Sequence, residues 1–148
     1  MDKSQINLQT TIPTTREKLF EFMTTPGQVR LALPGLIESN NISEMPLQVG
    51  STFDYKYKMY GVIVEGQWKV LALESPSRYE SRTTGGAVST WKYAFEEVEG
   101  GTQLSLTLEY EVPESLLGQV KVGILKKINE KEAAHFFENL RAVFEMQG

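Results

Sequence analysis

Polar and apolar residues alternate along much of residues 6–112, and this period of two predicts strands. In residues 52–59, Phe53, Tyr55 and Tyr57 share one face, and the charged residues between them share the other. The candidate strands are residues 6–12, 36–43, 51–59, 62–73, 78–84, 89–98 and 102–112. Short turns join most of these strands, two of them with paired glycines. We therefore expect an antiparallel meander of six to seven strands.

A helical period replaces the alternation directly after the first strand. Between Pro13 and Pro26, apolar residues recur at three- and four-residue spacing, which predicts one short amphipathic helix. Thr14 or Thr15 can cap its first turn. A second short helical piece is predicted at residues 27–33, where the following proline and glycine break any continuation.

The last quarter of the chain, residues 114–146, consists mostly of strong helix formers, with Gly118 and Gly123 expected to bend or interrupt its first third. Its apolar stripe contains Leu125, Ile128, Ala133, Phe136, Phe137, Leu140, Val143 and Phe144. This stripe needs an apolar partner, and the concave face of the sheet is the only large one available. The predicted fold class is therefore α+β, with a curved antiparallel sheet wrapped around a long C-terminal helix. The two short helices close one end, and a ligand pocket can remain inside.

Composition narrows the class of protein. The chain has 148 residues, the size of a single domain spanning 1–148, and its formal net charge is −4. This charge gives no basic face for nucleic acid. No apolar run approaches the ~20 residues of a membrane helix, and MDKSQINLQ contains no apolar h-region, so we expect no signal peptide in this sequence. We expect a cytoplasmic protein with no integral membrane association and no nucleic-acid partner.

Several segments resemble one superfamily across nearly the whole chain. They are the stretch from strand to short helices in residues 12–35, Gly101-Thr102, Glu109-Tyr110, Pro113 and the sequence ENLRAVFE in the last helix. Together they resemble the START-like or Bet v 1-like (SRPBCC) superfamily, and within it the polyketide cyclase/dehydrase-type branch. The sequence ALPG at residues 32–35 is also similar to carbon monoxide dehydrogenase G-subunit-like proteins.

The resemblance implies a helix-grip fold with an internal cavity for a hydrophobic small molecule. It does not imply one activity, because the superfamily contains lipid and sterol carriers, hormone receptors, aromatase/cyclases and ubiquinone-associated proteins. A fold of this kind supports many functions, so function has to be argued from the site.

Candidate cavity-lining residues follow from the inward faces of the predicted strands and helix. They are Phe53, Tyr55, Tyr57, Trp68, Tyr79, Ser81, Trp91, Tyr93, Phe95, Leu106, Ile128, Asn129, Glu132 and Phe136. The aromatic residues either pack in a solid core or line a cavity. Tyr79, Ser81 and Thr83 share one face, and three hydroxyls on an inward face are typical of a wetted cavity.

The C-terminal helix also carries polar residues near its apolar stripe. Asn129 falls within the stripe, and Glu132 and Asn139 fall near its edge. Burying such a group without a partner costs about 1–3 kcal/mol. These side chains therefore either reach solvent at a cavity mouth, bond the opposing sheet, or orient the polar end of a ligand.

Catalytic chemistry has little support in the sequence. His135 is the only histidine, and the helical projection places it about 100° from the centre of the stripe, on an exposed or flanking face. With one histidine and no cysteine, no zinc ligand set is expected, and no cofactor is predicted. No serine hydrolase signature occurs either.

Three functions remain open. The leading hypothesis is binding or transport of a hydrophobic small molecule, such as a lipid, isoprenoid or polyketide-like compound. The first alternative is a polyketide cyclase/aromatase or dehydratase-like enzyme, with Glu132 and a cavity tyrosine moving protons. The second is a protein-interaction module, which predicts an exposed apolar patch. The sequence leaves the ligand and the oligomeric state undetermined.

Overall fold

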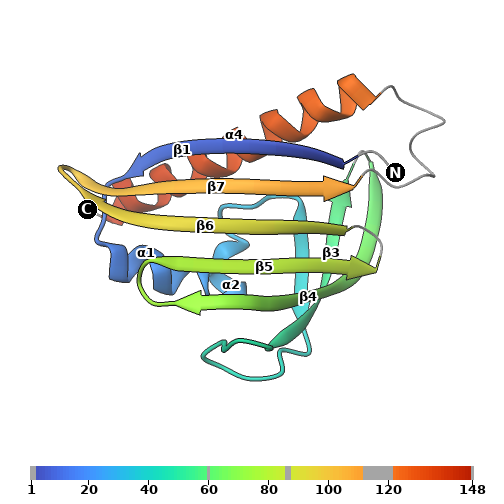
Figure 1. Ribbon diagram of the computed structural model, residues 1–148, viewed down its shortest axis with the longest axis horizontal. Helices are drawn as coiled ribbons and strands as arrows, with labels where there is room; N and C mark the ends of the chain where they lie inside the picture. Colours follow the sequence, from blue (N-terminus) through green and yellow to red (C-terminus); the bar gives the residue numbers. More distant parts are fainter. Residues whose placement is uncertain (1–2, 60, 86–87, 112–121, 148) are drawn as a thin grey trace.

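The protein folds as one curved antiparallel sheet with its helices on one side, as a computed structural model covering residues 3–59, 61–85, 88–111 and 122–147 shows (Figure 1). The elements in chain order are β1 (Lys3–Ile12), α1 (Arg16–Met23), α2 (Pro26–Val29), β2 (Leu36–Asn40), β3 (Thr52–Met59), β4 (Val62–Glu74), β5 (Arg78–Gly85), β6 (Val88–Val98), β7 (Gly101–Glu111) and α4 (Val122–Gln147). The predicted α+β class is confirmed, and the sheet has seven strands.

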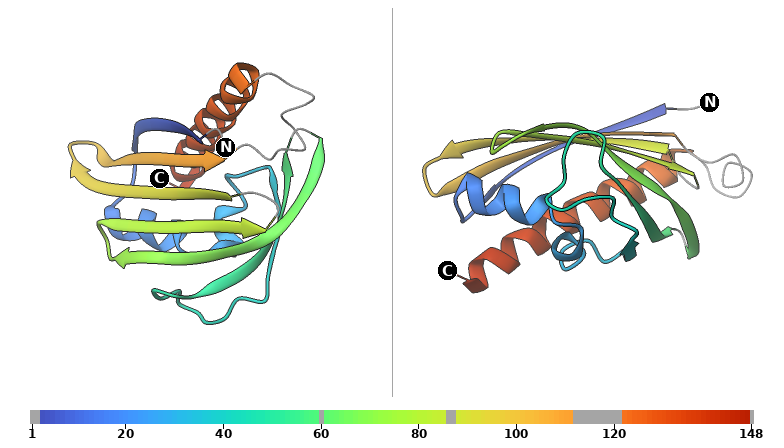
Figure 2. Two further views of the ribbon diagram at one scale, coloured as in Figure 1. Left: turned by 45° about the vertical axis from the view of Figure 1, so that its right-hand side comes forward. Right: turned by 90° about the horizontal axis from the view of Figure 1, so that it is seen from below.

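The strand order is β1-β7-β6-β5-β4-β3-β2, so strands β2 to β7 form a continuous meander. The exception is β1, which pairs with β7 from Lys3 opposite Glu111 to Ile12 opposite Thr102. Register shifts interrupt the ladders between Leu36 and Glu38 and between Val70 and Ala72. The sheet curls around the helices, as the side view in Figure 2 shows. Its concave face therefore becomes the wall of the interior.

The two short helices form where the sequence predicts them, but α2 ends at Val29 and does not continue to Leu33. Thr15 is the N-cap of α1, and its Oγ1 accepts a hydrogen bond from the backbone N–H of Lys18 at 3.2 Å. The buried face of α1 packs in two directions: Phe20 meets Phe95 on β6 with ring centroids 5.2 Å apart, and Phe22 meets Phe144 on α4 at 5.3 Å. Edge-to-face pairs of this kind add to the free energy of burial. The helix pair thus closes one end of the curled sheet.

The long helix α4 lies across the concave side and packs against β1. Its buried residues are Ala133, Phe136, Phe137, Leu140 and Phe144, all members of the predicted stripe. Asn139 donates from Nδ2 to the carbonyl oxygen of Ala32 at 3.0 Å, which ties α4 to the segment after α2. The amide therefore has a partner, but that partner lies on the segment after α2 and not on the sheet. The predicted first part of the helix, residues 114–121, lies outside the described residues.

Charged residues occupy the convex face of the sheet. Lys92 pairs with Glu109 at 2.7 Å, and Arg78 pairs with Glu80 at 2.6 Å. Lys92, Glu109 and Arg78 are about half exposed, whereas Glu80 is 17% exposed, and pairs that face solvent in this way contribute little to stability in water. Their positions agree with the alternation, which predicts that the charged residues of these strands lie on the face opposite the apolar residues. No helix in the described part of the chain is long and apolar enough to cross a membrane.

Candidate functional site

The interior contains a pocket that opens between the sheet and the first half of the described α4, and we call it the outer pocket. It offers about 70 Å³ of room for the centres of water-sized spheres, within about 650 Å³ of empty space that includes open solvent. Its lining residues are Tyr55, Tyr57, Val64, Trp68, Thr83, Val88, Ser89, Trp91, Leu108, Tyr110, Glu111, Asn129 and Glu132. An apolar wall with a few polar groups is the usual composition of a small-molecule site.

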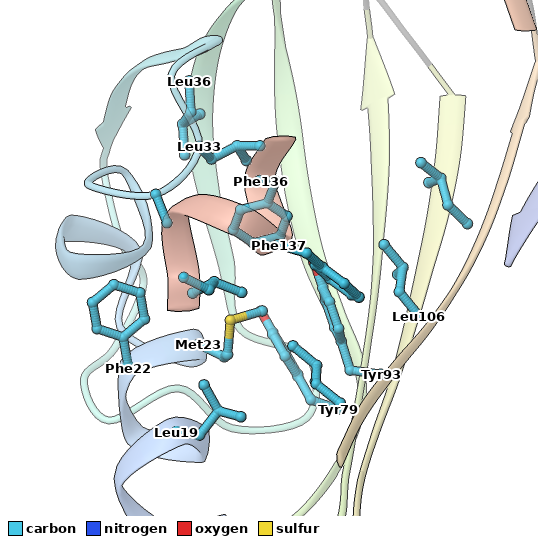
Figure 3. Close-up of a cluster of buried hydrophobic side chains, with 14 of the residues drawn as sticks. Leu19, Phe22, Met23, Leu33, Leu36, Tyr79, Tyr93, Leu106, Phe136 and Phe137 are labelled. Atoms are coloured by element: carbon cyan, nitrogen blue, oxygen red, sulfur yellow. The ribbon is translucent and has the colours of Figure 1, made fainter. Parts of the chain in front are cut away.

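A second space, the inner pocket, lies deeper, beneath α1 and α2. It offers about 30 Å³ of room for the centres of water-sized spheres. Its lining residues are Met23, Pro26, Val29, Leu33, Leu36, Phe53, Trp68, Tyr79, Ser81 and Tyr93. Figure 3 shows Tyr79 and Tyr93 side by side on the sheet, beside Met23 from α1 and Phe137 from α4. Trp68 lines both pockets.

The register of the sheet brings one inner-pocket residue, Phe53, and four outer-pocket residues into one row. Phe53 pairs with Trp68, Trp68 pairs with Thr83, and Thr83 pairs with Ser89 across strands β3 to β6. Ser89 in turn pairs with Tyr110 on β7. Paired residues in an antiparallel sheet point to the same face, so all five side chains project to the concave side. A correct strand register is therefore what assembles the pocket.

Two glycines leave room for the tyrosine rings of the outer pocket. A Cβ atom on Gly35 would lie 2.5 Å from Cζ of Tyr57. On Gly66 it would meet the carbonyl oxygen of Thr84 and would lie 2.9 Å from the hydroxyl of Tyr55. Separations under 3 Å are steric overlaps, so a side chain at residue 35 would displace the Tyr57 ring, and at residue 66, where the overlap is with the backbone, only glycine fits. The pocket wall depends on residues that have no side chain.

Hydroxyl groups hold both indole rings. Nε1 of Trp68 donates to Oγ of Ser81 at 2.7 Å, and Nε1 of Trp91 donates to Oγ of Ser89 at 2.9 Å. Oγ of Ser89 also lies 2.6 Å from Oγ1 of Thr83, where either atom can donate. The two indoles are in contact, with ring centroids 5.6 Å apart. The hydroxyl groups of Ser81 and Ser89 thus orient the two indole rings that form part of the pocket wall.

The tyrosines of the inner pocket are deeply buried. Burial raises the pKa of Tyr79 to about 12, and a hydrogen bond with Ser81 opposes part of that rise. Burial also raises the pKa of Tyr93 well above its ordinary value, with smaller contributions from Tyr79 and Tyr57. Desolvation is the main cause in both cases, because the phenolate loses its hydration. Both phenols therefore stay neutral near pH 7.

The outer pocket has its own polar groups. The hydroxyl of Tyr110 is buried and has no hydrogen-bond partner among the described residues. On α4, Asn129 is half-buried, whereas Glu132 is exposed at the rim, where partial burial raises the pKa of its carboxyl group. The lining contains no lysine, arginine or histidine among the described residues. This site provides hydrogen-bonding groups for a ligand but no cation that would pair with an anionic one.

Most of the candidate residues named from the sequence line one of the two pockets. Tyr55, Tyr57, Trp91, Asn129 and Glu132 line the outer pocket; Phe53, Tyr79, Ser81 and Tyr93 line the inner one; Trp68 lines both. The structure places the other four elsewhere. Phe95, Leu106 and Phe136 lie in the packed core, and Ile128 on α4 lies outside both linings. Phe95 is covered by Phe20, which explains why an inward position does not reach a cavity.

Seven outer-pocket residues were not among the candidates: Val64, Thr83, Val88, Ser89, Leu108, Tyr110 and Glu111. The alternation does place Thr83, Leu108 and Tyr110 on inward faces, so a signal for them exists. Alternation predicts which face of the strand a residue lies on. It does not predict whether that inward residue lines a pocket or is covered by a helix. His135 is exposed on α4, as its position on the helical projection predicts.

Metal-ligating side chains do not gather in the described part of the chain. No group of three or more histidine, aspartate or glutamate residues there lies close enough to hold a metal ion.

In the helix-grip class of proteins, a curved antiparallel sheet wraps around a long C-terminal helix, and an apolar pocket lies between the two. This protein has that arrangement. Sequence comparison identifies the family: the profile described as polyketide cyclase/dehydrase and lipid transport matches residues 4–145. The chain therefore belongs to this family, of the START-like or Bet v 1-like superfamily, and the resemblance stated from the sequence is confirmed. No curated protein matches the chain.

Solved structures show the same fold at low sequence identity. The protein TTHA0849 from Thermus thermophilus aligns with a TM-score of 0.82 and 14% identity, over 98% of this chain and 99% of that one. Major latex-like protein 151 from Panax ginseng aligns with a TM-score of 0.72 and 15% identity, over 96% and 97%. Ara h 8.0201 aligns with a TM-score of 0.68 and 14% identity, over 98% and 99%. Identities this low establish the fold alone.

Proposed function

We propose that this protein binds a hydrophobic small molecule in the outer pocket and carries or sequesters it. Membership of a family described by polyketide cyclase/dehydrase and lipid transport supports a ligand of this class. The ligand is expected to be lipid, isoprenoid or polyketide-like, with an apolar body against Trp68 and Trp91.

One observation carries the proposal. The outer pocket combines an aromatic wall with a buried Tyr110 hydroxyl that has no partner among the described residues. A buried hydroxyl without a hydrogen bond costs about 1–3 kcal/mol, so a core designed only for packing would avoid it. A ligand with a hydroxyl, carbonyl or ether oxygen would satisfy it while burying its apolar part.

Native mass spectrometry of the purified protein tests this function. We expect a discrete mass adduct that is lost on denaturation, and organic extraction then identifies the released compound. The protein stripped of this compound should bind it again with one-to-one stoichiometry. A mass equal to that of the bare chain, together with no binding from a panel of isoprenoid, fatty-acyl and polyketide-like compounds, would contradict the proposal.

A second function, cyclase- or dehydratase-like proton transfer, is favoured by Glu132. Its carboxyl group lines the outer pocket, and partial burial raises its pKa, as is typical of carboxylates used for proton transfer. If the wild-type protein converts a poly-β-keto compound, Glu132→Gln should lower kcat by about 100-fold or more. Glu130→Gln is the matched control, because Glu130 is exposed on the same helix and does not line the outer pocket. Unchanged turnover in Glu132→Gln would remove this residue from the mechanism.

A further inference from the structure

We propose that Trp68 sets the depth of the binding site, and that the natural ligand is therefore compact and cyclic rather than a long acyl chain. This inference rests on the proposed function and specifies the shape of the ligand. Trp68 is the only residue that lines both pockets among the described residues. Its indole forms the partition between the outer pocket and the inner pocket.

Four contacts fix the indole in that position. Nε1 donates to the buried Ser81 hydroxyl at 2.7 Å, which sets the orientation of the ring. Phe53 stacks on the indole with ring centroids 5.7 Å apart and planes 15° apart. Tyr55 meets it edge-on at 5.5 Å, and Trp91 meets it at 5.6 Å. Rotation of the indole would break the hydrogen bond and these ring contacts together, so Trp68 acts as a fixed wall.

The sizes of the two spaces point to the ligand shape. The outer pocket has about 70 Å³ for the centres of water-sized spheres, and the inner pocket has about 30 Å³. A flexible chain entering from the rim meets the indole before it can reach the inner pocket. A ring system instead fills the outer space and lies against the faces and edges of the aromatic wall.

A homologous series of n-alkanols measures the depth directly. Each additional buried CH2 group strengthens binding about fourfold. We would measure affinities from n-hexanol to n-dodecanol by displacement of the neutral fluorophore N-phenyl-1-naphthylamine, with 2-naphthol as the compact competitor. For the wild-type protein we expect the affinity to stop rising within the series, and 2-naphthol to bind at least about tenfold more tightly than n-dodecanol.

Variants at the partition and beside it test the assignment. In Trp68→Ala, and in the milder Trp68→Leu if the first variant folds poorly, affinity should continue to rise to n-dodecanol by about tenfold or more. Adding Val29→Phe refills the inner pocket and should restore the plateau. The control Trp91→Ala changes a tryptophan that lines only the outer pocket, and it should weaken all alkanols without extending the series.

The outcomes separate the two proposals. A wild-type affinity that rises steadily through n-dodecanol, or a plateau that persists in both Trp68 variants, overturns the role of Trp68 while ligand binding itself stands. A protein that binds neither the fluorophore nor any competitor fails at the proposed function instead. A gain in Trp68→Ala that survives the added Val29→Phe shows general loosening of the core, and this also overturns the partition.

Discussion

Tyr110 is the residue on which the proposed ligand binding depends most directly. Its ring lies among the inward residues of β7, yet its hydroxyl has no hydrogen-bond partner in the described part of the protein. Ser39 on β2 shares the same condition, but it lies outside the lining of both pockets. Ser39 is therefore a control for Tyr110, because of these two buried hydroxyls only the one on Tyr110 lies at the outer pocket.

Tyr110→Phe should leave the ligand-free protein equally stable or more stable by up to about 1 kcal/mol, because an unsatisfied polar group is removed. Its affinity for n-decanol, whose hydroxyl can pair with the phenol, should fall by about tenfold at most. Urea unfolding measures the stability, and fluorophore displacement measures the affinity.

The matched variant Ser39→Ala should have an unchanged affinity for n-decanol. Equal affinities of wild-type protein and Tyr110→Phe would show that the hydroxyl does not contact the ligand.

At the scale of the element, strand β4 needs a residue without a side chain at position 66. Gly66 lies in β4 where it pairs with Tyr55 on one side and with Gly85 on the other. A side chain there would meet the backbone of β5 and the ring of Tyr55. The strand can pass under the tyrosine only because residue 66 has no Cβ atom.

Gly66→Ala is expected to destabilise the protein by about 2 kcal/mol or more, because the contact with a backbone oxygen cannot be relieved by a rotamer change. Gly27→Ala in α2 is the control, since nothing lies within 4 Å of the added atom. That substitution should be neutral or stabilise by up to about 1 kcal/mol. Thermal and urea unfolding of both variants provide the comparison. Equal effects of the two substitutions would contradict the steric explanation.

The elements were largely predictable from the sequence, whereas the depth of the site was not. Clean alternation in β3 and β7 identifies both the strands and their inward faces, because a half-buried strand requires it. Phe95 and Trp91 look equivalent by this criterion, yet α1 covers Phe95 and leaves Trp91 at the outer pocket. That difference arises from tertiary packing between distant segments. The pairing of Thr83 with Ser89 likewise depends on strand register, which residue spacing alone does not determine.

At the scale of the whole molecule, the buried tyrosines link stability to alkaline pH. The pKa of Tyr79 is raised from its ordinary value of 10 to about 12, and the pKa of Tyr93 is also raised. The folded protein thus keeps a proton on each phenol at pH values where the unfolded chain has lost it. The stability that this provides is complete below pH 10 and is lost as the pH rises toward the folded pKa.

Between pH 10 and about 12 we expect Tyr79 to lower the free energy of unfolding by about 1.4 kcal/mol per pH unit. Urea unfolding of the wild-type protein and of Tyr79→Phe at intervals from pH 9 to pH 12 measures the difference in slope. The variant should lose stability less steeply over this range. Parallel curves would show that Tyr79 does not contribute to alkaline unfolding.

The pairing of β1 with β7 also determines when the fold can be completed. Lys3 lies opposite Glu111, so the first strand to be synthesised pairs with the last. A nascent chain that ends before β7 can form the inner hairpins of the meander, but β1 remains without its neighbour and α4 has not yet been made. Contacts between such distant segments slow folding. Of the strands in this sheet, β1 is made before its only neighbour β7 by nearly the length of the meander, and its unpaired edge is exposed to other chains until β7 is available.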